Sequence, residues 1–179
     1  VALLVGGAGA ALAMVALLRW FKRHDNRIYA HYLMHDFAHS AQDGGRYSAA
    51  IERRIGQFRQ EIAAALAQPC DEVLVVGHSS GAHLAVSILA DLLREGRAPS
   101  GPALSLLSLG HVVPMVSFLP GASRLRADLR FLSESEALAW VDVTAPGDGC
   151  AFALCDPVKV SGVATDRQRW PLIFSAAFS

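Results

Sequence analysis

The sequence predicts an α/β protein with a mostly parallel sheet flanked by helices, preceded by an apolar N-terminal helix. Two observations predict this class. Short apolar, β-favouring runs alternate with helical patterns from residue 28 onward, which is typical of βαβ units and a parallel sheet. The first eighteen residues are uncharged and apolar. A chain of 179 residues, 53% of them hydrophobic, can bury one good core, so we expect a single folded domain over residues 28–179.

Residues 1–23 are expected to form a transmembrane helix. Residues 1–18 reach the length of about 18 apolar residues that a membrane span requires, and the run Arg19-Trp20-Phe21-Lys22-Arg23 follows. By the positive-inside rule, the membrane-anchored domain would face the cytoplasm. An odd number of cysteines without a C-x-x-C pair agrees with that compartment. A buried core helix and a cleaved signal peptide are the alternatives, although basic and aromatic residues stand where a signal peptide has its cleavage site.

The remaining elements follow from periodicity and from the positions of glycine and proline. Residues 47–68 show apolar side chains at three- and four-residue spacing and end at Pro69, so they predict an amphipathic helix. Residues 112–130 interrupt the alternation of strands and helices, and we expect them to form a lid. The expected strands are residues 28–38, 71–76, 103–109 and 136–143, and the expected helices are residues 47–68 and 80–95.

The segment from Val73 to Ala85 carries the most informative pattern. An apolar run leads into Gly77-His78-Ser79-Ser80-Gly81, a G-x-S-x-G motif, and a helical pattern follows. In that setting the serine sits on a strained strand-to-helix turn that pushes its hydroxyl out above the sheet edge. Glycines two residues before and after it lack the Cβ that would clash where strand and helix approach. The motif therefore predicts Ser79 as a nucleophile; a glycine-rich turn that happens to contain serines is the alternative.

From residue 28 to residue 148, with Gly77–Gly81 as its most specific element, the chain resembles the α/β-hydrolase superfamily of serine esterases, lipases and thioesterases. The resemblance implies a Ser-His-acid triad in the chain order serine, acid, histidine. It further implies a serine hydrolase that cleaves a carboxylic ester or thioester through an acyl-Ser79 intermediate, with a small-molecule acyl ester or a lipid as substrate. A non-catalytic scaffold or interaction protein on a hydrolase fold is one alternative, and an acyltransferase is another.

The candidate acids follow the last expected strand. Asp148 comes after Pro146-Gly147 in the turn at the expected carboxyl edge, where open α/β sheets bind their ligands. Asp142 lies within the alternating pattern of the strand, so it would face one side of the sheet, and Asp156 is a third candidate. We expect Asp148 to be the triad acid, and the alternative is a turn aspartate that binds its own backbone.

The base is the missing member of the triad. All seven histidines precede Asp148, so none takes the place that the resemblance assigns to the base. His78 and His83 are expected to pack near the turn that carries Ser79. His39 and His111 follow expected strands and could approach Ser79. We expect the catalytic histidine to lie beyond Ser179, in a longer protein of which this chain is a fragment, and the chain alone to be inactive.

The resemblance also implies an oxyanion hole. Its first amide would be that of Ser80, directly after the nucleophile. Its second would be that of Ser40, with His39 as the alternative, in a loop after an earlier expected strand. We expect no cofactor and no metal, because His31 and His35 fall in an expected strand and lack the intervening glutamate of a zinc-protease helix. The balance of 16 basic and 16 acidic residues argues against nucleic acid as a partner.

Overall fold

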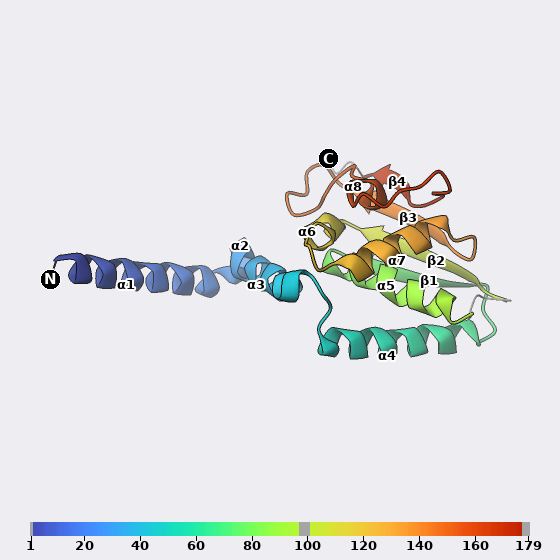
Figure 1. Cartoon of the computed structure of the whole chain (residues 1–179), viewed down its shortest axis with the longest axis horizontal. Coiled ribbons are helices and arrows are strands. Elements are labelled where there is room, and N and C mark those ends of the chain that lie inside the picture. The colour runs from blue at the N-terminus through green and yellow to red at the C-terminus, as the bar shows by residue number, and fades with distance from the viewer. Residues whose placement is uncertain (1, 97–100, 177–179) are drawn as a thin grey trace. The chain divides into compact units, whose positions relative to one another are not determined.

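The computed structural model describes residues 2–96 and 101–176, with side chains described from residue 6 onward. The chain divides into two compact units, Val1–Ser40 and Ala41–Ser179 (Figure 1). The first unit is helical, and the second contains the whole sheet.

The first unit holds α1 (Ala2–Arg23), α2 (Asp25–Ile28) and nearly all of α3 (Ala30–Ala41). Tyr29, with a left-handed φ of 55°, separates α2 from α3. The Asp25 carboxylate accepts hydrogen bonds from the backbone amides of His31 at 2.7 Å and Tyr32 at 3.0 Å, and so satisfies amides of the first turn that have no helical partner. The expected strand over residues 28–38 is therefore wrong. A short apolar run fits a strand or a helix equally well, and the Asp25 cap favours the helix.

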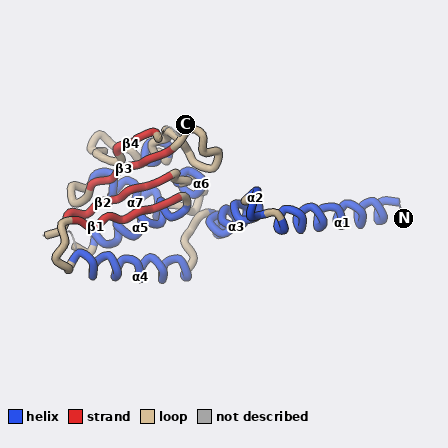
Figure 2. Tube along the Cα trace, turned by 180° about the vertical axis from the view of Figure 1, so that it is seen from behind, coloured by secondary structure: helices blue, strands red, loops and turns tan. Residues whose placement is uncertain are grey.

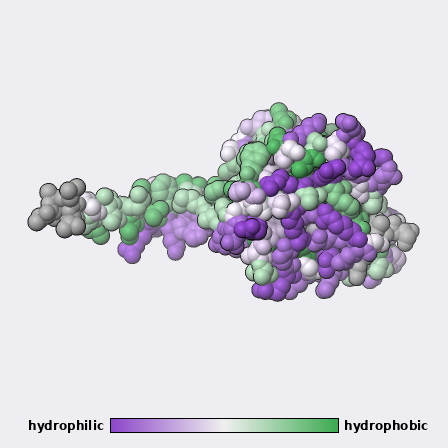
Figure 3. Space-filling view, viewed as in Figure 1, coloured by the Kyte–Doolittle hydropathy of each residue, from purple (hydrophilic) through white to green (hydrophobic). Residues whose placement is uncertain are grey.

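Most of the apolar side chains that the structure describes on α1 are exposed. Leu12 is 71% exposed and Met14 is 59% exposed, and Figure 3 shows the apolar surface along this helix. Within the part of the chain that the structure describes, no helix is both long enough and apolar enough to cross a membrane. The membrane-spanning helix expected over residues 1–23 is therefore not supported.

The second unit is built on a four-stranded parallel sheet in the order β1-β2-β3-β4. Its strands are β1 (Glu72–His78), β2 (Ala103–Leu109), β3 (Ala139–Thr144) and β4 (Leu172–Ser175). Its helices are η1 (Gln42–Gly44), α4 (Ala49–Leu66), α5 (Ser80–Arg94), α6 (Val113–Ser117), α7 (Ser123–Glu134) and α8 (Pro157–Val160). The α/β class with a parallel sheet and flanking helices is confirmed, as are both expected helices and the last three expected strands.

The core lies between the sheet and the helices α5 and α7, which cover the same face of it (Figure 1). Val86 and Leu89 of α5 are fully buried in one cluster with Leu106 of β2 and Trp140 of β3. Burying an aliphatic side chain of this size stabilises the fold by about 1.5–3 kcal/mol. The helix that follows the G-x-S-x-G motif is therefore anchored firmly on the sheet.

Residues 112–130 belong to this core and do not form the expected lid. They make α6 and the first half of α7, and Val113, Val116 and Leu125 are buried. Phe118, between the two helices, stays exposed. The interruption of the alternation therefore comes from two short helical segments that pack on the core through Val113, Val116 and Leu125. The short α6, with Pro114 in its first turn, explains why the helical periodicity of this segment is hard to read.

The opposite face of the sheet is apolar and exposed. The strand register places Val76, Leu107, Val141 and Leu172 in one row across the four strands, and Val76 and Leu172 are 53% and 49% exposed. Phe174, next on that side of β4, is 54% exposed. The strand order explains why this face is uncovered. Each connection moves one strand further in the same direction, from β1 to β4. Because parallel crossovers are right-handed, all of the connecting helices then lie on the other face of the sheet (Figure 2).

Candidate active site

Ser79 stands at the junction of β1 and α5, where the motif predicts it. Its backbone has φ 54° and ψ −121°, a region that residues with a side chain rarely adopt. Its amide donates a hydrogen bond of 3.0 Å to the Leu109 carbonyl at the end of β2, which ties the turn to the carboxyl edge of the sheet. Strain of this kind costs about 1–3 kcal/mol and is maintained by the surrounding structure. The strained strand-to-helix turn is therefore confirmed.

The two glycines of the motif differ in what they permit. A Cβ added to Gly77 would lie 2.8 Å from the Cα of Ala82 and 2.9 Å from the carbonyl oxygen of Gly81. Both are backbone atoms of α5, so the strand and the helix would have to separate. A Cβ added to Gly81 would meet nothing within 4 Å. The close approach expected at both positions exists at Gly77, and the expectation for Gly81 is wrong.

The expected oxyanion donors are found in different units. α5 begins at Ser80, so the amide expected as first donor belongs to the first turn of a helix, where the dipole favours negative charge. Ser40, the second expected donor, lies in the last turn of α3. The strand that was expected to bring it to the sheet edge is a helix. Ser40 therefore is not placed relative to Ser80.

Asp148 lies in an exposed turn after β3, at the same edge of the sheet as Ser79. Its Oδ1 accepts the Cys150 amide at 2.9 Å, as the alternative interpretation of a turn aspartate expects. Its Oδ2 would lie 3.3 Å from a Cβ added to Gly110, the residue after Leu109. Since the Leu109 carbonyl accepts the Ser79 amide, the Asp148 carboxylate and Ser79 both adjoin the end of β2. One carboxylate oxygen holds the turn, and the other faces this edge.

Asp142 faces one side of the sheet, as the alternation of its strand predicts, and that side is the one covered by the helices. It is 0% exposed and pairs in register with Ser108. The Ser108 hydroxyl donates to Oδ1 of Asp142 and accepts the indole N–H of Trp140 at 2.8 Å. Such a carboxylate is part of the core.

His111 completes this buried network. Its Nδ1 accepts the Val113 amide at 3.4 Å, which leaves the ring proton on Nε2. Nε2 donates to the Cys155 carbonyl at 3.1 Å and lies 3.6 Å from Oδ2 of Asp142. Burial raises the pKa of Asp142 above its ordinary value, although the nearby His111 and the Ser108 hydrogen bond lower it. Both ring nitrogens of His111 are engaged in the core, so it does not serve Ser79 as a base.

Of the other candidate histidines, His78 and His83 lie in the same unit as Ser79, and His39 lies in the first unit. His83 is buried as expected, with its ring stacked on Tyr47 and its Nδ1 3.1 Å from the Tyr47 hydroxyl, and burial raises the pKa of that hydroxyl. His78 is exposed at the end of β1. His39 lies on α3 in the first unit and is not placed relative to Ser79.

Asp156, the third candidate acid, has a structural role. Its Oδ1 accepts the amides of Val158 at 2.9 Å and Lys159 at 3.1 Å, and so caps α8. Its Oδ2 accepts the Gln168 side-chain amide at 2.9 Å. Both oxygens are therefore occupied by local contacts, which leaves Asp148 as the most accessible of the three aspartates.

Among the residues that the structure describes, no group of three or more His, Cys, Asp or Glu side chains is arranged to hold a metal ion. Cys70, Cys150 and Cys155 are free thiols. What the sheet edge does assemble is a serine hydroxyl on a strained turn, the amino end of an anchored helix, and a carboxylate across the next strand. This arrangement can support nucleophilic attack and stabilise an oxyanion, provided that a base is supplied.

The buried network of Ser108, Asp142 and His111 is not among the sites expected from the sequence. A signal for it is present in the sequence. Ser108 comes two residues after Leu106, and Asp142 two residues after Trp140. Because residues two apart in a strand face the same side of the sheet, both polar side chains lie on the buried face with these apolar residues.

Comparison with known proteins gives no matching family model, no similar curated protein and no similar solved structure.

Proposed function

We propose that this chain carries the nucleophile of a serine hydrolase that cleaves a carboxylic ester or a thioester. The observation that supports it best is the backbone of Ser79, with φ 54° and ψ −121° between a parallel strand and a helix. Observed strain that the surrounding structure maintains is typical of functional residues. The resemblance of the motif to that of α/β-hydrolases, and the position of the turn at the carboxyl edge of the sheet, support the same proposal.

In the proposed reaction the Ser79 oxygen bonds to the acyl carbon while a base takes the hydroxyl proton. The amides of the first turn of α5, that of Ser80 first among them, stabilise the oxyanion. The bond from the acyl carbon to the alkoxide or thiolate then breaks, and that group leaves with the proton from the base. Water, activated by the same base, releases the acid and restores Ser79.

Asp148 is the proposed acid that orients the base. Its Oδ1 is fixed by the Cys150 amide at 2.9 Å, so its second oxygen is held in one direction, toward the sheet edge. In the order serine, acid, histidine, the base would follow β4, and we assign it to residues after Ser179. Loss of the base from a serine triad lowers kcat about a million-fold, so we expect no measurable turnover from the 179-residue chain alone.

Labelling with a fluorophosphonate probe tests the proposal. We expect the protein extended past Ser179 to be labelled on one serine, and Ser79→Ala to abolish labelling. Ser80→Ala is the matched control, because the neighbouring serine has the same chemistry but lies inside the helix; it should retain at least about half the labelling. Labelling that survives Ser79→Ala would refute the nucleophile.

Two other functions predict different outcomes. An acyltransferase would also be labelled on Ser79, but it would transfer the acyl group to an acceptor other than water, which product analysis distinguishes. A non-catalytic scaffold on a hydrolase fold is favoured by one observation: His111, which lies in the same unit as Ser79 and close to the sheet edge, is committed to the core. A fully extended protein that the probe does not label would support the scaffold.

A further inference from the structure

We propose that His31 and His35 chelate a divalent late transition metal ion, such as Zn²⁺, Ni²⁺ or Cu²⁺. Both residues lie on α3, one turn apart. In the strand expected from the sequence the two residues share a face only by period two and lie about 13 Å apart. On a helix, residues four apart are neighbours on the same face. The proposal concerns the first unit of the chain and is independent of the hydrolase proposal.

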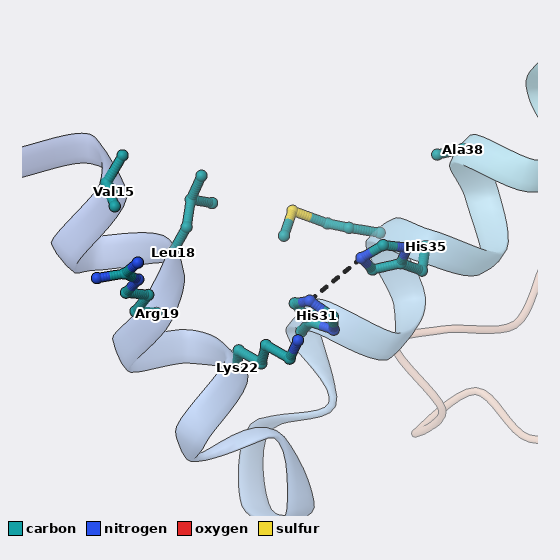
Figure 4. A pocket seen from close by; sticks show the side chains of 8 residues that line it. Val15, Leu18, Arg19, Lys22, His31, His35 and Ala38 are labelled. Atoms are coloured by element: carbon teal, nitrogen blue, oxygen red, sulfur yellow. Dashed lines mark hydrogen bonds between the residues drawn. The ribbon is translucent and has the colours of Figure 1, made fainter. Parts of the chain in front are cut away.

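The distance between the two ring nitrogens fits a chelate. Nε2 of His31 lies 3.1 Å from Nε2 of His35 (Figure 4), and the ring centroids are 4.2 Å apart. Bonds of about 2.0–2.1 Å from one metal ion to two imidazole nitrogens place those nitrogens about 2.9 Å apart at a right angle and about 3.3 Å apart at the tetrahedral angle. The observed separation lies between these values, so the distance between the two nitrogens suits a chelate, and binding requires the rings to turn both Nε2 lone pairs toward one ion.

The chemistry of the pair favours metals that prefer nitrogen ligands. Without a metal, one Nε2 donates its hydrogen to the lone pair of the other. A metal ion takes the Nε2 lone pairs of both rings: the acceptor ring already carries its proton on Nδ1, and the proton of the donor ring moves from Nε2 to Nδ1. Imidazole suits Zn²⁺, Ni²⁺ and Cu²⁺ better than Mg²⁺ or Ca²⁺. Since only the neutral ring binds, affinity falls as the pH falls.

The pair opens onto a pocket of about 390 Å³ with room for further ligands from water. Arg19 and Lys22 of α1 also line it (Figure 4). The described residues that line it include no acidic side chain; the others are Val15, Leu18, Met34 and Ala38. The two cations repel a metal ion and attract an anion. Replacing one of them with a neutral residue should therefore strengthen the binding of a metal ion and weaken the binding of an anion.

The test is a calorimetric titration of the full chain, produced without a polyhistidine tag, with NiCl₂ at pH 7.5. We expect one equivalent to bind, His31→Gln and His35→Gln each to weaken binding at least about tenfold, and Lys22→Gln to strengthen it. His39→Gln is the matched control. His39 lies four residues after His35 on the same helix, but the close nitrogen contact joins His35 to His31, so this variant should stay within about twofold of the natural chain.

A second readout is the helical circular dichroism signal. A metal that bridges two turns binds the helix and not the coil, so NiCl₂ should raise the melting temperature of the natural chain and not that of His35→Gln. Equal losses in His31→Gln and His39→Gln, or no binding at all, would overturn the proposal. So would binding of inorganic phosphate in place of Ni²⁺, if Lys22→Gln abolished it, because the pocket would then be an anion site.

Discussion

Replacing Gly77 with alanine perturbs the closest approach between the strand and the helix on either side of Ser79. The new Cβ would lie 2.8 Å, 2.9 Å and 3.1 Å from three backbone atoms of Gly81 and Ala82, where ordinary contact begins at 3.4 Å. Relieving the shortest contact requires a shift of about 0.6 Å between β1 and α5. Overpacking of this kind costs about 1–3 kcal/mol. Reduced freedom of the unfolded chain offsets about 0.4–1 kcal/mol of it, so we expect a net loss of about 1–2 kcal/mol.

Gly81→Ala is the matched control, since it adds the same methyl group four residues along the chain. Its Cβ meets nothing within 4 Å and lies in the first turn of α5, so alanine should stabilise the helix by about 0.5–1 kcal/mol. Urea unfolding followed by circular dichroism gives the unfolding free energy of both variants. A difference between them of less than about 0.5 kcal/mol would refute the reasoning, because the strand and the helix would then have room for a side chain.

Further predictions concern the buried network and the strained turn. Ser108→Ala leaves the buried Asp142 carboxylate and the Trp140 indole N–H without their partner, and it should lower the unfolding free energy by about 2–4 kcal/mol. The control is Ser105→Ala, on the opposite face of the same strand, which should change the unfolding free energy by less than about 0.5 kcal/mol. The pKa of Asp142 is raised in the folded state, so the folded protein binds the Asp142 proton more tightly than the unfolded chain does. This stabilisation is complete below the pKa of the unfolded chain, about 4, and is lost as the pH rises through the pKa of the folded state. Relative to Asp142→Asn, the natural chain should therefore lose stability with rising pH in that window, by at most about 1.4 kcal/mol per pH unit; equal slopes in urea unfolding would contradict the burial of this charge. Ser79→Gly should raise the unfolding free energy by about 1 kcal/mol, because glycine adopts the positive φ without strain. If the variant instead lowers the unfolding free energy by about 1 kcal/mol, the turn is not strained.

Much of the second unit could be predicted from the sequence because its signals are local. The strand leading to Gly77 and the helix leaving Ser80 are both strongly apolar and bounded by clear breakers. The strained backbone of Ser79 follows from the same short motif. The alternation of its strand also predicts correctly that Asp142 faces one side of the sheet. These features depend on neighbours within a few residues.

The errors come from features that a local pattern does not determine. Whether residues 28–38 form a strand or a helix depends on the Asp25 cap and the left-handed Tyr29, which weigh more than a short apolar run. The lid expected over residues 112–130 is core, because exposure depends on what packs against Leu125 from elsewhere in the chain. The commitment of His111 to the core depends on Val113 and on the distant Cys155 carbonyl. No spacing rule connects those residues.

The exposed apolar face of the sheet changes how dye-based measurements on this protein should be interpreted. Dyes such as ANS bind exposed apolar surface, and their binding is usually taken as a sign of a molten globule. The row from Val76 to Leu172 presents such a surface in the folded state. Because the register of four strands aligns the row, melting of the sheet disperses it. The fluorescence of a bound dye should therefore start high and fall as the protein unfolds, and a loss of dye signal, not a gain, would report the melting of this sheet.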